Sequence, residues 1–355
     1  MNAPFFPSTP TVGLIDQADP RIGPFLHDHP QATAFHDPRW LAAVETGTGH
    51  RALILAATCG ARLVGLLPLH LVHSPIFGRV LASTGFAVDG GILVEGPEQA
   101  EPLRQAATEL ATRLSCPSIE LRGGAMPAEE GAGWSLKRDA HCGFVTPLAD
   151  GEEAQLLAIP RKQRAEVRKG LDRDLTVTTG STARDRAAHY AVYAESVRNL
   201  GTPVFPRSLF AAVLDRFGDD ADVLTVWSGD QPVASVLSLY HRGAVMPYWG
   251  GGTLAARQLR ANDRMYFALM RHARERGCER FDFGRSKTGS GAYHFKRNWG
   301  FTPEPLTYAG WTASGQPARD ADPTSARHQA LIAAWKRLPL GLANRIGPWI
   351  ARGLG

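Results

Sequence analysis

The segment Phe281–Phe301, FDFGRSKTGSGAYHFKRNWGF, gathers a carboxylate, several cations and several hydroxyls in a glycine-rich stretch. Its composition is similar to that of a nucleotide-binding loop. A Walker A loop requires a lysine directly after its second glycine, where this chain has Ser290. A dinucleotide fingerprint requires a third glycine at the position that His294 occupies. The spacing therefore excludes both common classes of nucleotide site.

Asp282 is the candidate base of this segment. It alternates with Phe281 and Phe283 along a predicted strand, so its side chain points to the opposite face. Ligands of open α/β sheets bind where neighbouring strands separate at their carboxyl ends, and a carboxylate there can accept a proton. The alternative is a buried structural aspartate paired with Arg280 or Arg285.

Other polar side chains around this strand are candidate substrate contacts. Arg285 and Ser286 follow the strand directly, in a loop whose glycines allow a close approach to a substrate. Tyr293 lies near the start of the helix expected after the loop. Tyr248 precedes a run of three glycines and either lines an acceptor groove or packs in the core.

A second group of cations lies in IPRKQRAEVRKGLDRDL, between the two halves of the chain. A helix that begins near Pro160 places Arg161, Arg164 and Arg168 on one face, with Lys162 beside them. Crowded like charges repel unless an anion or an acidic neighbour offsets them. The helix is therefore either an anion-recognition helix or a solvated linker.

The elements that must position these residues form two similar halves. Each half contains a predicted hairpin, RALILAAT with RLVGLLPLHLVH and DVLTVWS with VASVLSLYH. Helices follow from about Glu98 to Leu114 and from about Asn262 to Arg276, with Asn262 as the expected N-cap and Gly277 as the C′ residue. Each helix leads to a strand, SIELRGG or RFDFGRS. The pattern predicts a duplicated α/β protein.

The composition restricts the class of protein further. The chain has 355 residues with 44% hydrophobic residues and a formal net charge of +5, which favours an anionic substrate or surface. No apolar run is long enough for a membrane span, and the N-terminus lacks the pattern of a secretory signal. We therefore expect a cytoplasmic protein. The four cysteines and the close histidine pairs match no metal-binding spacing, so we expect no metal.

The tail, residues 313–355, has a polar start and then an apolar pattern with scattered arginines and lysines. It is either docked on the core or lies as an amphipathic segment on a membrane surface, which would make the protein peripheral at the inner face of the membrane. Pro339 and Pro348 are expected to break any long helix.

Residues 20–310 resemble a known family through five motifs. These are HDPRW, IPRKQRAEVRKGL, TPVFPRSLF, GGGTLAARQLRAND and FDFGRSKTGSGAYHFKRNWGFTPEPL. Together they resemble the FemAB-like acyltransferases, and most closely the FemAB family associated with XrtA/PEP-CTERM exopolysaccharide systems. The resemblance implies two tandem GNAT-like domains with mixed sheets, and transfer of an acyl or aminoacyl group to an amine or hydroxyl of a cell-envelope or exopolysaccharide precursor.

This resemblance makes Lys296 a candidate catalytic residue. It lies four residues before Gly300-Phe301, where simple GNAT enzymes have a tyrosine that acts as general acid. A lysine there can stabilise an oxyanion or bind a donor phosphate. The alternative is a surface lysine on an amphipathic helix.

The resemblance leaves the donor open. GNAT enzymes use acyl-CoA, while FemAB-like enzymes of cell-wall synthesis use aminoacyl-tRNA, and neither implies a tightly bound cofactor. In GGGTLAARQLRAND the glycines precede the arginines, so the usual CoA loop is absent. The expected partners are an anionic small molecule or lipid-linked sugar, a tRNA donor, and a membrane surface for the tail.

We expect four segments. These are a degenerate GNAT-like domain over residues 1–150, a basic linker helix over 151–180, a catalytic GNAT-like domain over 181–312 and the tail over 313–355. The first half is considered degenerate because no helix with a Phe-Lys pair follows IELRGG. The rival function is a non-catalytic carbohydrate or lipid-carrier binding protein. An enzyme that lost Lys296 and Asp282 would lose turnover more than binding.

Overall fold

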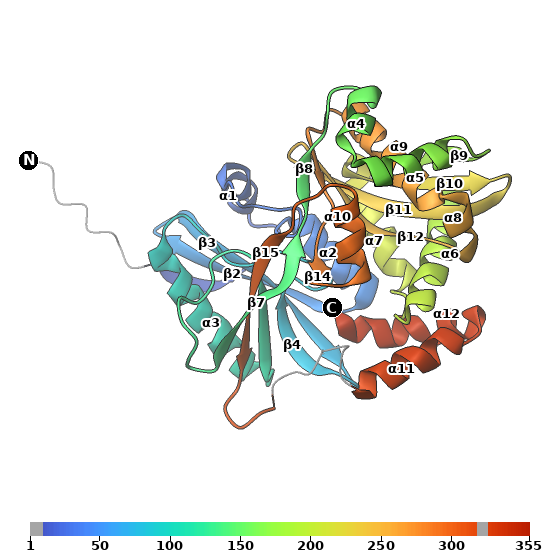
Figure 1. Ribbon diagram of the computed structural model, residues 1–355. Coiled ribbons are helices and arrows are strands. Elements are labelled where there is room, and N and C mark those ends of the chain that lie inside the picture. Colours follow the sequence, from blue (N-terminus) through green and yellow to red (C-terminus); the bar gives the residue numbers. More distant parts are fainter. Residues whose placement is uncertain (1–9, 318–325) are drawn as a thin grey trace, which may run out of the picture. The chain divides into compact units, whose positions relative to one another are not determined.

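The computed structural model describes residues 10–317 and 326–355 and divides into two compact units. Among the described residues, the first unit comprises residues 10–138, 307–317 and 353–355, and the second comprises residues 139–306 and 326–352. Figure 1 labels their helices and strands. Each unit has a mixed β-sheet with helices packed on it, which confirms the predicted fold class.

The sheet of the second unit has the strand order β8-β13-β12-β11-β10-β9. Neighbouring strands are antiparallel except for β12 and β13, which are parallel. The strands are β8 (Val145–Pro147), β9 (Thr176–Gly180), β10 (Ala221–Ser228), β11 (Gln231–His241), β12 (Ala244–Gly252) and β13 (Arg280–Asp282). The helices are α4 (Glu152–Ala158), α5 (Arg161–Leu171), α6 (Ala183–Leu200), α7 (Arg207–Phe217), α8 (Leu254–Leu259), α9 (Ala261–Glu275), α10 (Gly291–Asn298), α11 (Ala326–Arg337) and α12 (Leu340–Ala351).

The sheet of the first unit contains the order β1-β2-β3-β4-β6-β15, with β5 paired to β3. Here too a single neighbouring pair on this path, β4 with β6, is parallel. The strands are β1 (Thr11–Ile15), β2 (Arg51–Cys59), β3 (Arg62–Ser74), β4 (Gly78–Ser83), β5 (Leu93–Val94), β6 (Ser118–Arg122) and β15 (Glu304–Thr312). The helices are α1 (Ile22–Asp28), α2 (Pro38–Thr48) and α3 (Ala100–Arg113). Strands β7 (Trp134–Gly143) and β15 both run across the division between the units.

The two units repeat one order of elements. In each, a strand is followed by two helices, three consecutive antiparallel strands, a helical segment (α3, or α8 and α9), and a strand parallel to the last of the three. Both predicted hairpins are present, as β2 with β3 and β10 with β11. Their long apolar strands are buried, which is why apolar runs separated by turn residues were enough to locate them. The duplication inferred from the sequence is confirmed.

In each sheet the strand that pairs with the last strand of the repeat comes from outside the repeat. In the first unit β15 pairs with β6, so that Tyr308 lies opposite Arg122. In the second unit β8 pairs with β13, so that Val145 lies opposite Asp282. Each partner satisfies backbone groups along a strand that would otherwise be an open edge. The sequence-based division at residue 150 placed β8 with the first half and β15 with the second, which differs from these pairings.

Helix boundaries followed the expected signals with two exceptions. Gly277 ends α9 with a positive φ of 81°, as expected of a C′ glycine. Asn262, however, is not the N-cap, because α9 already begins at Ala261 after Arg260 in the left-handed region. The chain breaks before α12 at Pro339 as expected, but Pro348 lies inside α12, so the expectation of a second break was wrong.

The glycines that end β12 are required by packing. A Cβ on Gly251 would lie 2.2 Å from the Ser196 hydroxyl on α6, and one on Gly252 would lie 2.6 Å from the Ala256 Cβ on α8. A Cβ on Gly250 would lie 2.8 Å from a methyl of Val236 on β11. The run therefore lets helices and a neighbouring strand approach β12 closely.

We expect Gly251→Ala to destabilise the protein, because Ser196 is buried on a helix and cannot move aside. Inserting a methyl group into such a contact typically costs about 1–3 kcal/mol of unfolding free energy. The measurement is urea unfolding of the variant beside Gly251→Ala/Ser196→Gly, which should recover part of the loss. Gly341→Ala is the control, because its added Cβ meets nothing within 4 Å. Equal stability of both alanine variants would contradict the packing argument.

Candidate active site

The candidate site of the second unit begins where β12 and β13 separate. Their parallel pairing joins Ala244 to Arg280 and Val245 to Phe281, and it extends no further. Strand β12 continues to Gly252 with β11 as its partner. The carboxyl-terminal half of β12 therefore diverges from β13, and such points are where ligands bind in open α/β sheets.

A β-bulge interrupts the regular pairing of β12 with β11 at this divergence. Leu237 of β11 lies opposite Trp249, while its neighbour Ser238 lies opposite Pro247, so Tyr248 is an extra residue in β12. Bulges are common next to active sites because they redirect a side chain and disturb the regular backbone pairing. Trp249 is buried against Phe210, with ring centroids 4.9 Å apart, so it packs in the core. Tyr248 is half-buried, which is compatible with its predicted role as a substrate contact.

Lys296 is buried, with 8% of its surface exposed, and is not a surface residue of α10. Its ammonium group donates hydrogen bonds to the backbone carbonyls of Gly284 at 3.1 Å and Arg285 at 3.0 Å. It also lies 5.3 Å from the ring centroid of Phe144 and 5.6 Å from that of Phe283. Burial lowers the pKa of Lys296 to about 8, although the nearby Asp282 carboxylate opposes this shift.

Asp282 has the predicted orientation. Phe281 and Phe283 are buried in the core of the second unit, whereas the Asp282 side chain lies on the other face and is half-buried. Its carboxylate accepts a hydrogen bond from the Gly284 backbone N–H at 2.8 Å. Burial raises the pKa of Asp282, and the Gly284 hydrogen bond and the charge of Lys296 oppose that rise. Asp282 and Lys296 thus hold the same turn from two sides.

The loop between β13 and α10 contains the remaining predicted contacts. It includes β14 (Ser286–Lys287), which pairs with Cys142 and His141 of β7. The Ser286 hydroxyl is buried and has no hydrogen-bond partner among the described residues, so it is suited to contact a ligand. Arg285 is half-buried, and its charge helps to lower the pKa of Lys296.

Tyr293 packs beside this loop. Its ring meets that of Phe144 edge-on, with centroids 5.6 Å apart, and its backbone N–H donates to the Ser290 hydroxyl that caps α10. Trp299 and Phe301 are buried with Phe281 and Phe283 in the core of the second unit. This aromatic packing is what fixes α10, and with it Lys296, against the strand.

The basic helix α5 presents its cations to solvent. Its packed face consists of Gln163, Val167 and Gly170. Arg161, Lys162 and Arg168 are exposed, and Arg164 is half-buried with a hydrogen bond to the Leu157 carbonyl. The structure thus keeps the predicted cations together on the outer face of α5.

Helix α5 lies over the N-terminus of α9, where a GNAT enzyme would hold a pyrophosphate. Gln163 donates to Asp263 at 2.5 Å, and Glu166 pairs with Arg260 at 2.8 Å. A Cβ on Gly170 would lie 2.9 Å from the Arg260 carbonyl oxygen. Free N–H groups at a helix N-terminus are what bind phosphate, and here a helix and a carboxylate occupy that position. The residues present therefore do not form the usual CoA cradle.

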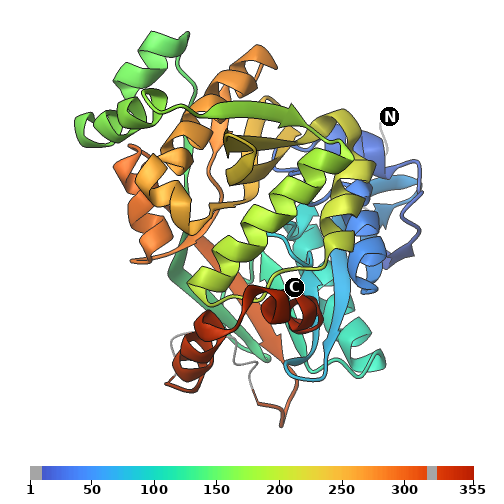
Figure 2. The same cartoon turned by 90° about the vertical axis from the view of Figure 1, so that its right-hand side faces the viewer.

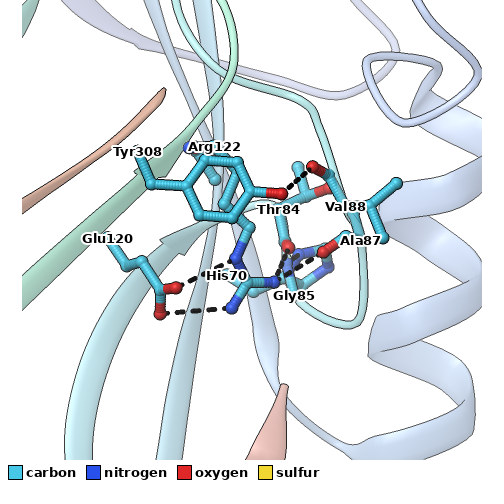
Figure 3. A network of polar contacts seen from close by, with 9 residues as sticks. His70, Thr84, Gly85, Ala87, Val88, Glu120, Arg122 and Tyr308 are labelled. Carbon is cyan, nitrogen blue, oxygen red and sulfur yellow. Dashed lines mark hydrogen bonds and ion pairs between the residues drawn. The ribbon is translucent and has the colours of Figure 1, made fainter. Parts of the chain in front are cut away.

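In the first unit, side-chain hydrogen bonds fill the position that corresponds to the divergence of β12 and β13. Arg122 of β6 is buried, pairs with Glu120 at 3.2 Å and donates to the backbone carbonyls of Thr84 and Ala87 (Figure 3). The Arg122 backbone N–H donates to the Ser83 hydroxyl at 3.0 Å. A parallel bridge between Ile92 and Gly124 also joins the chain after β6 to the segment before β5. The loop that follows β4 is thus bonded to β6 past the end of their ladder.

Further side chains fix the same loop after β4. The Tyr308 hydroxyl donates to the Val88 carbonyl at 2.7 Å, and His70 accepts from the Gly85 N–H at 3.0 Å (Figure 3). Burial lowers the pKa of His70 to about 4, so it is neutral. The chain passes from β6 to β7 without a helix. Sequence reasoning missed this network, whose signal was the charged pair Glu120 and Arg122 within a buried strand.

Comparisons with known proteins agree with this architecture. Residues 161–297 match the family model described as an acetyltransferase (GNAT) domain. A search of curated protein sequences finds no match. The fold is similar to the crystal structure of FemX, with a TM-score of 0.65 and 15% identity over 92% of this chain and 100% of that one.

Two further solved structures share the fold. One is a tandem GNAT protein from the clavulanic acid biosynthesis pathway, with a TM-score of 0.54 and 12% identity over 87% of this chain and 100% of that one. The other is the C-terminal domain (DUF2156) of a protein named as a lysylphosphatidylglycerol synthetase from Agrobacterium fabrum, with a TM-score of 0.51 and 16% identity over 78% of this chain and 88% of that one.

The fold and the family match define the class as a GNAT-fold protein whose residues 161–297 match an acetyltransferase (GNAT) domain. Within that class the chain has two tandem GNAT-like units and a fold similar to that of FemX.

The burial of Lys296 makes a prediction about stability. Folding lowers its pKa from 10.5 to about 8, so the buried ammonium weakens the folded state most below about pH 8. Above that pH the folded chain releases a proton that the unfolded chain still holds up to its own pKa. The free energy of unfolding of the wild type should therefore rise relative to Lys296→Met between about pH 8 and 10.5, by up to about 1.4 kcal/mol per pH unit.

Urea unfolding of both proteins across this pH range measures the difference, because the titration of other groups cancels between them. Lys162→Met, which removes an exposed lysine, is the matched control. A difference between wild type and Lys296→Met that stays constant with pH would show that Lys296 is not desolvated.

Proposed function

We propose that the second unit transfers an acyl group to an amine or hydroxyl of a cell-envelope or exopolysaccharide precursor in the cytoplasm. The observation that carries this proposal is the meeting of Asp282 and Lys296 at one turn, beside the point where β12 and β13 diverge. Titratable groups with pKa values shifted by burial cluster at functional sites. The resemblance of the sequence to the XrtA/PEP-CTERM-associated FemAB family supports the choice of acceptor.

In this proposal Asp282 is the base. Burial raises its pKa, which brings a carboxylate closer to the range in which a general base works at neutral pH. It takes a proton from the acceptor amine or hydroxyl as that group attacks the acyl carbonyl. The same hydrogen bond from Gly284 that orients the carboxylate keeps it at the end of β13.

Lys296 has two roles in this proposal. Two of its three N–H donors hold the carbonyls of Gly284 and Arg285, which fixes the loop that bears Arg285 and Ser286. The third donor is then directed to the oxyanion of the tetrahedral intermediate or to a donor phosphate. Ser286, Arg285, Tyr293 and Tyr248 line the site as substrate contacts in this proposal.

The donor is proposed to be acyl-CoA, which GNAT proteins use. Because α5 covers the N-terminus of α9, we propose that the exposed cations of α5 hold the anionic part of the donor in place of the usual loop. Aminoacyl-tRNA carries the same kind of charge on its phosphates and is the alternative donor that the experiments below distinguish.

Turnover is tested by thiol release from acetyl-CoA in the presence of amino sugars or hydroxylated sugars, beside transfer of a labelled amino acid from aminoacyl-tRNA. With the acceptor that gives turnover, Lys296→Met and Asp282→Asn should each lower kcat by about 10²–10³, because each removes a group that acts on the transition state. Donor affinity should change little. Thermal melts of both variants are needed as folding controls.

Two outcomes would contradict the assignment. If both variants turn over at the wild-type rate, Lys296 and Asp282 are structural. If the wild type binds a carbohydrate but transfers no acyl group from either donor, the protein is the non-catalytic carbohydrate or lipid-carrier binding protein.

The cationic face of α5 gives a separate prediction. Replacing Arg161, Arg164 and Arg168 together by glutamine should weaken binding of the donor roughly 10-fold at low salt, since exposed charge pairs contribute about 0.2–1 kcal/mol each. If the donor is a tRNA, each lost phosphate contact should also reduce the log–log salt slope by about 0.7–0.9.

Titration calorimetry with acetyl-CoA and with total tRNA, at several salt concentrations, measures both effects. The control replaces three exposed arginines of the first unit, Arg51, Arg113 and Arg138, and so changes the net charge equally. An unchanged affinity at low salt would identify α5 as a solvated face.

A further inference from the structure

Helix α12 is docked on the second unit by small residues. Its buried residues are Ala343, Gly347 and Ala351, spaced four apart along one face. A Cβ on Gly347 would lie 3.2 Å from the backbone nitrogen of Val204, so the helix approaches the protein backbone closely. Figure 2 shows α11 and α12 in red beside the long helix α6, with which both are in contact.

Three of the five large apolar residues of α12 are exposed, whereas Leu340 and Ile350 are half-buried. Leu342, Ile346 and Trp349 are 46%, 36% and 59% exposed, and their spacing places them on one face. A helix that docks on a protein normally buries its large apolar residues and exposes its polar ones. In α12 the fully buried residues are small instead, and an apolar strip is left in contact with solvent.

This strip lies in a cationic segment that contains no acidic residue. Residues 326–355 contain five cations and no acidic residue, and so account for the whole formal net charge of +5. Arg345 lies between Leu342 and Ile346 in sequence, and Arg352 follows the end of α12. An apolar strip with tryptophan, bordered by arginines and free of acids, has the composition of helices that lie in the interface of an anionic bilayer.

We propose that the outer face of α12 binds an anionic lipid surface. Trp349, Ile346 and Leu342 enter the boundary between headgroups and acyl chains, and the arginines contact the phosphates. The contact is peripheral, because no helix in residues 10–317 or 326–355 is long and apolar enough to cross a bilayer.

Sedimentation of the full-length protein with vesicles tests this proposal. Vesicles of phosphatidylcholine with about one third phosphatidylglycerol should bind the wild type at low salt, pure phosphatidylcholine should bind it much less, and high salt should weaken the binding. Leu342→Gln/Ile346→Gln/Trp349→Gln should abolish binding. Arg345→Gln/Arg352→Gln should weaken it by roughly fivefold for each arginine that lies near the surface.

The matched control is Leu157→Gln/Leu254→Gln, which removes two apolar residues of the same unit that are 58% and 71% exposed. It should bind vesicles like the wild type. Because all replaced apolar residues are exposed, thermal melting should be similar for every variant.

Two results would overturn the proposal. One is equal vesicle binding by the wild type and the triple glutamine variant. The other is no binding of the wild type to the anionic vesicles. In that case, self-association of the wild type in light scattering that is lost in the triple glutamine variant would assign the strip to a second copy of this chain. None of these measurements depends on turnover, so the outcome is independent of the proposed acyl transfer.

Discussion

The early end of the pairing between β12 and β13 is the constraint on which the second unit depends. Once the two strands diverge after Val245 and Phe281, backbone and side chains near their carboxyl ends need other partners. The bulge at Tyr248, the packed glycines that follow it and the turn at Gly284 are all responses to that divergence. The strand topology alone therefore creates a place where a ligand can bind, whatever side chains line it.

Buried charge gives this site its chemical character. Lys296 and Asp282 both lie where burial disfavours their ionised forms. The charge of each partly offsets the pKa shift that burial causes in the other. Their hydrogen bonds go to backbone atoms of the same turn. Two ionisable groups held in a fixed position, with pKa values moved toward neutrality, are what proton transfer and charge stabilisation require. The aromatic core around Phe283 and Trp299 provides the rigid support.

The two units share one order of elements but differ at the end of their parallel strand pair. In the first, Arg122 joins the strand to the carbonyls of Thr84 and Ala87, and Tyr308 from β15 holds the next part of the loop. The network satisfies the buried guanidinium, so it stabilises the unit and leaves that position filled. In the second, the corresponding strands are held apart. This difference supports the view that the first unit is the degenerate partner.

The sequence by itself determined the order of elements, because hairpins, helix ends and alternating burial depend on residues close together in the chain. It located both hairpins, the end of α9 at Gly277 and the outward direction of Asp282. Only the tertiary structure decided which strand closes each sheet, why Asn262 is not a cap, and that Lys296 is buried against two carbonyls. The outward apolar face of α12 was likewise decided there, since small residues reach a partner backbone that no local pattern specifies.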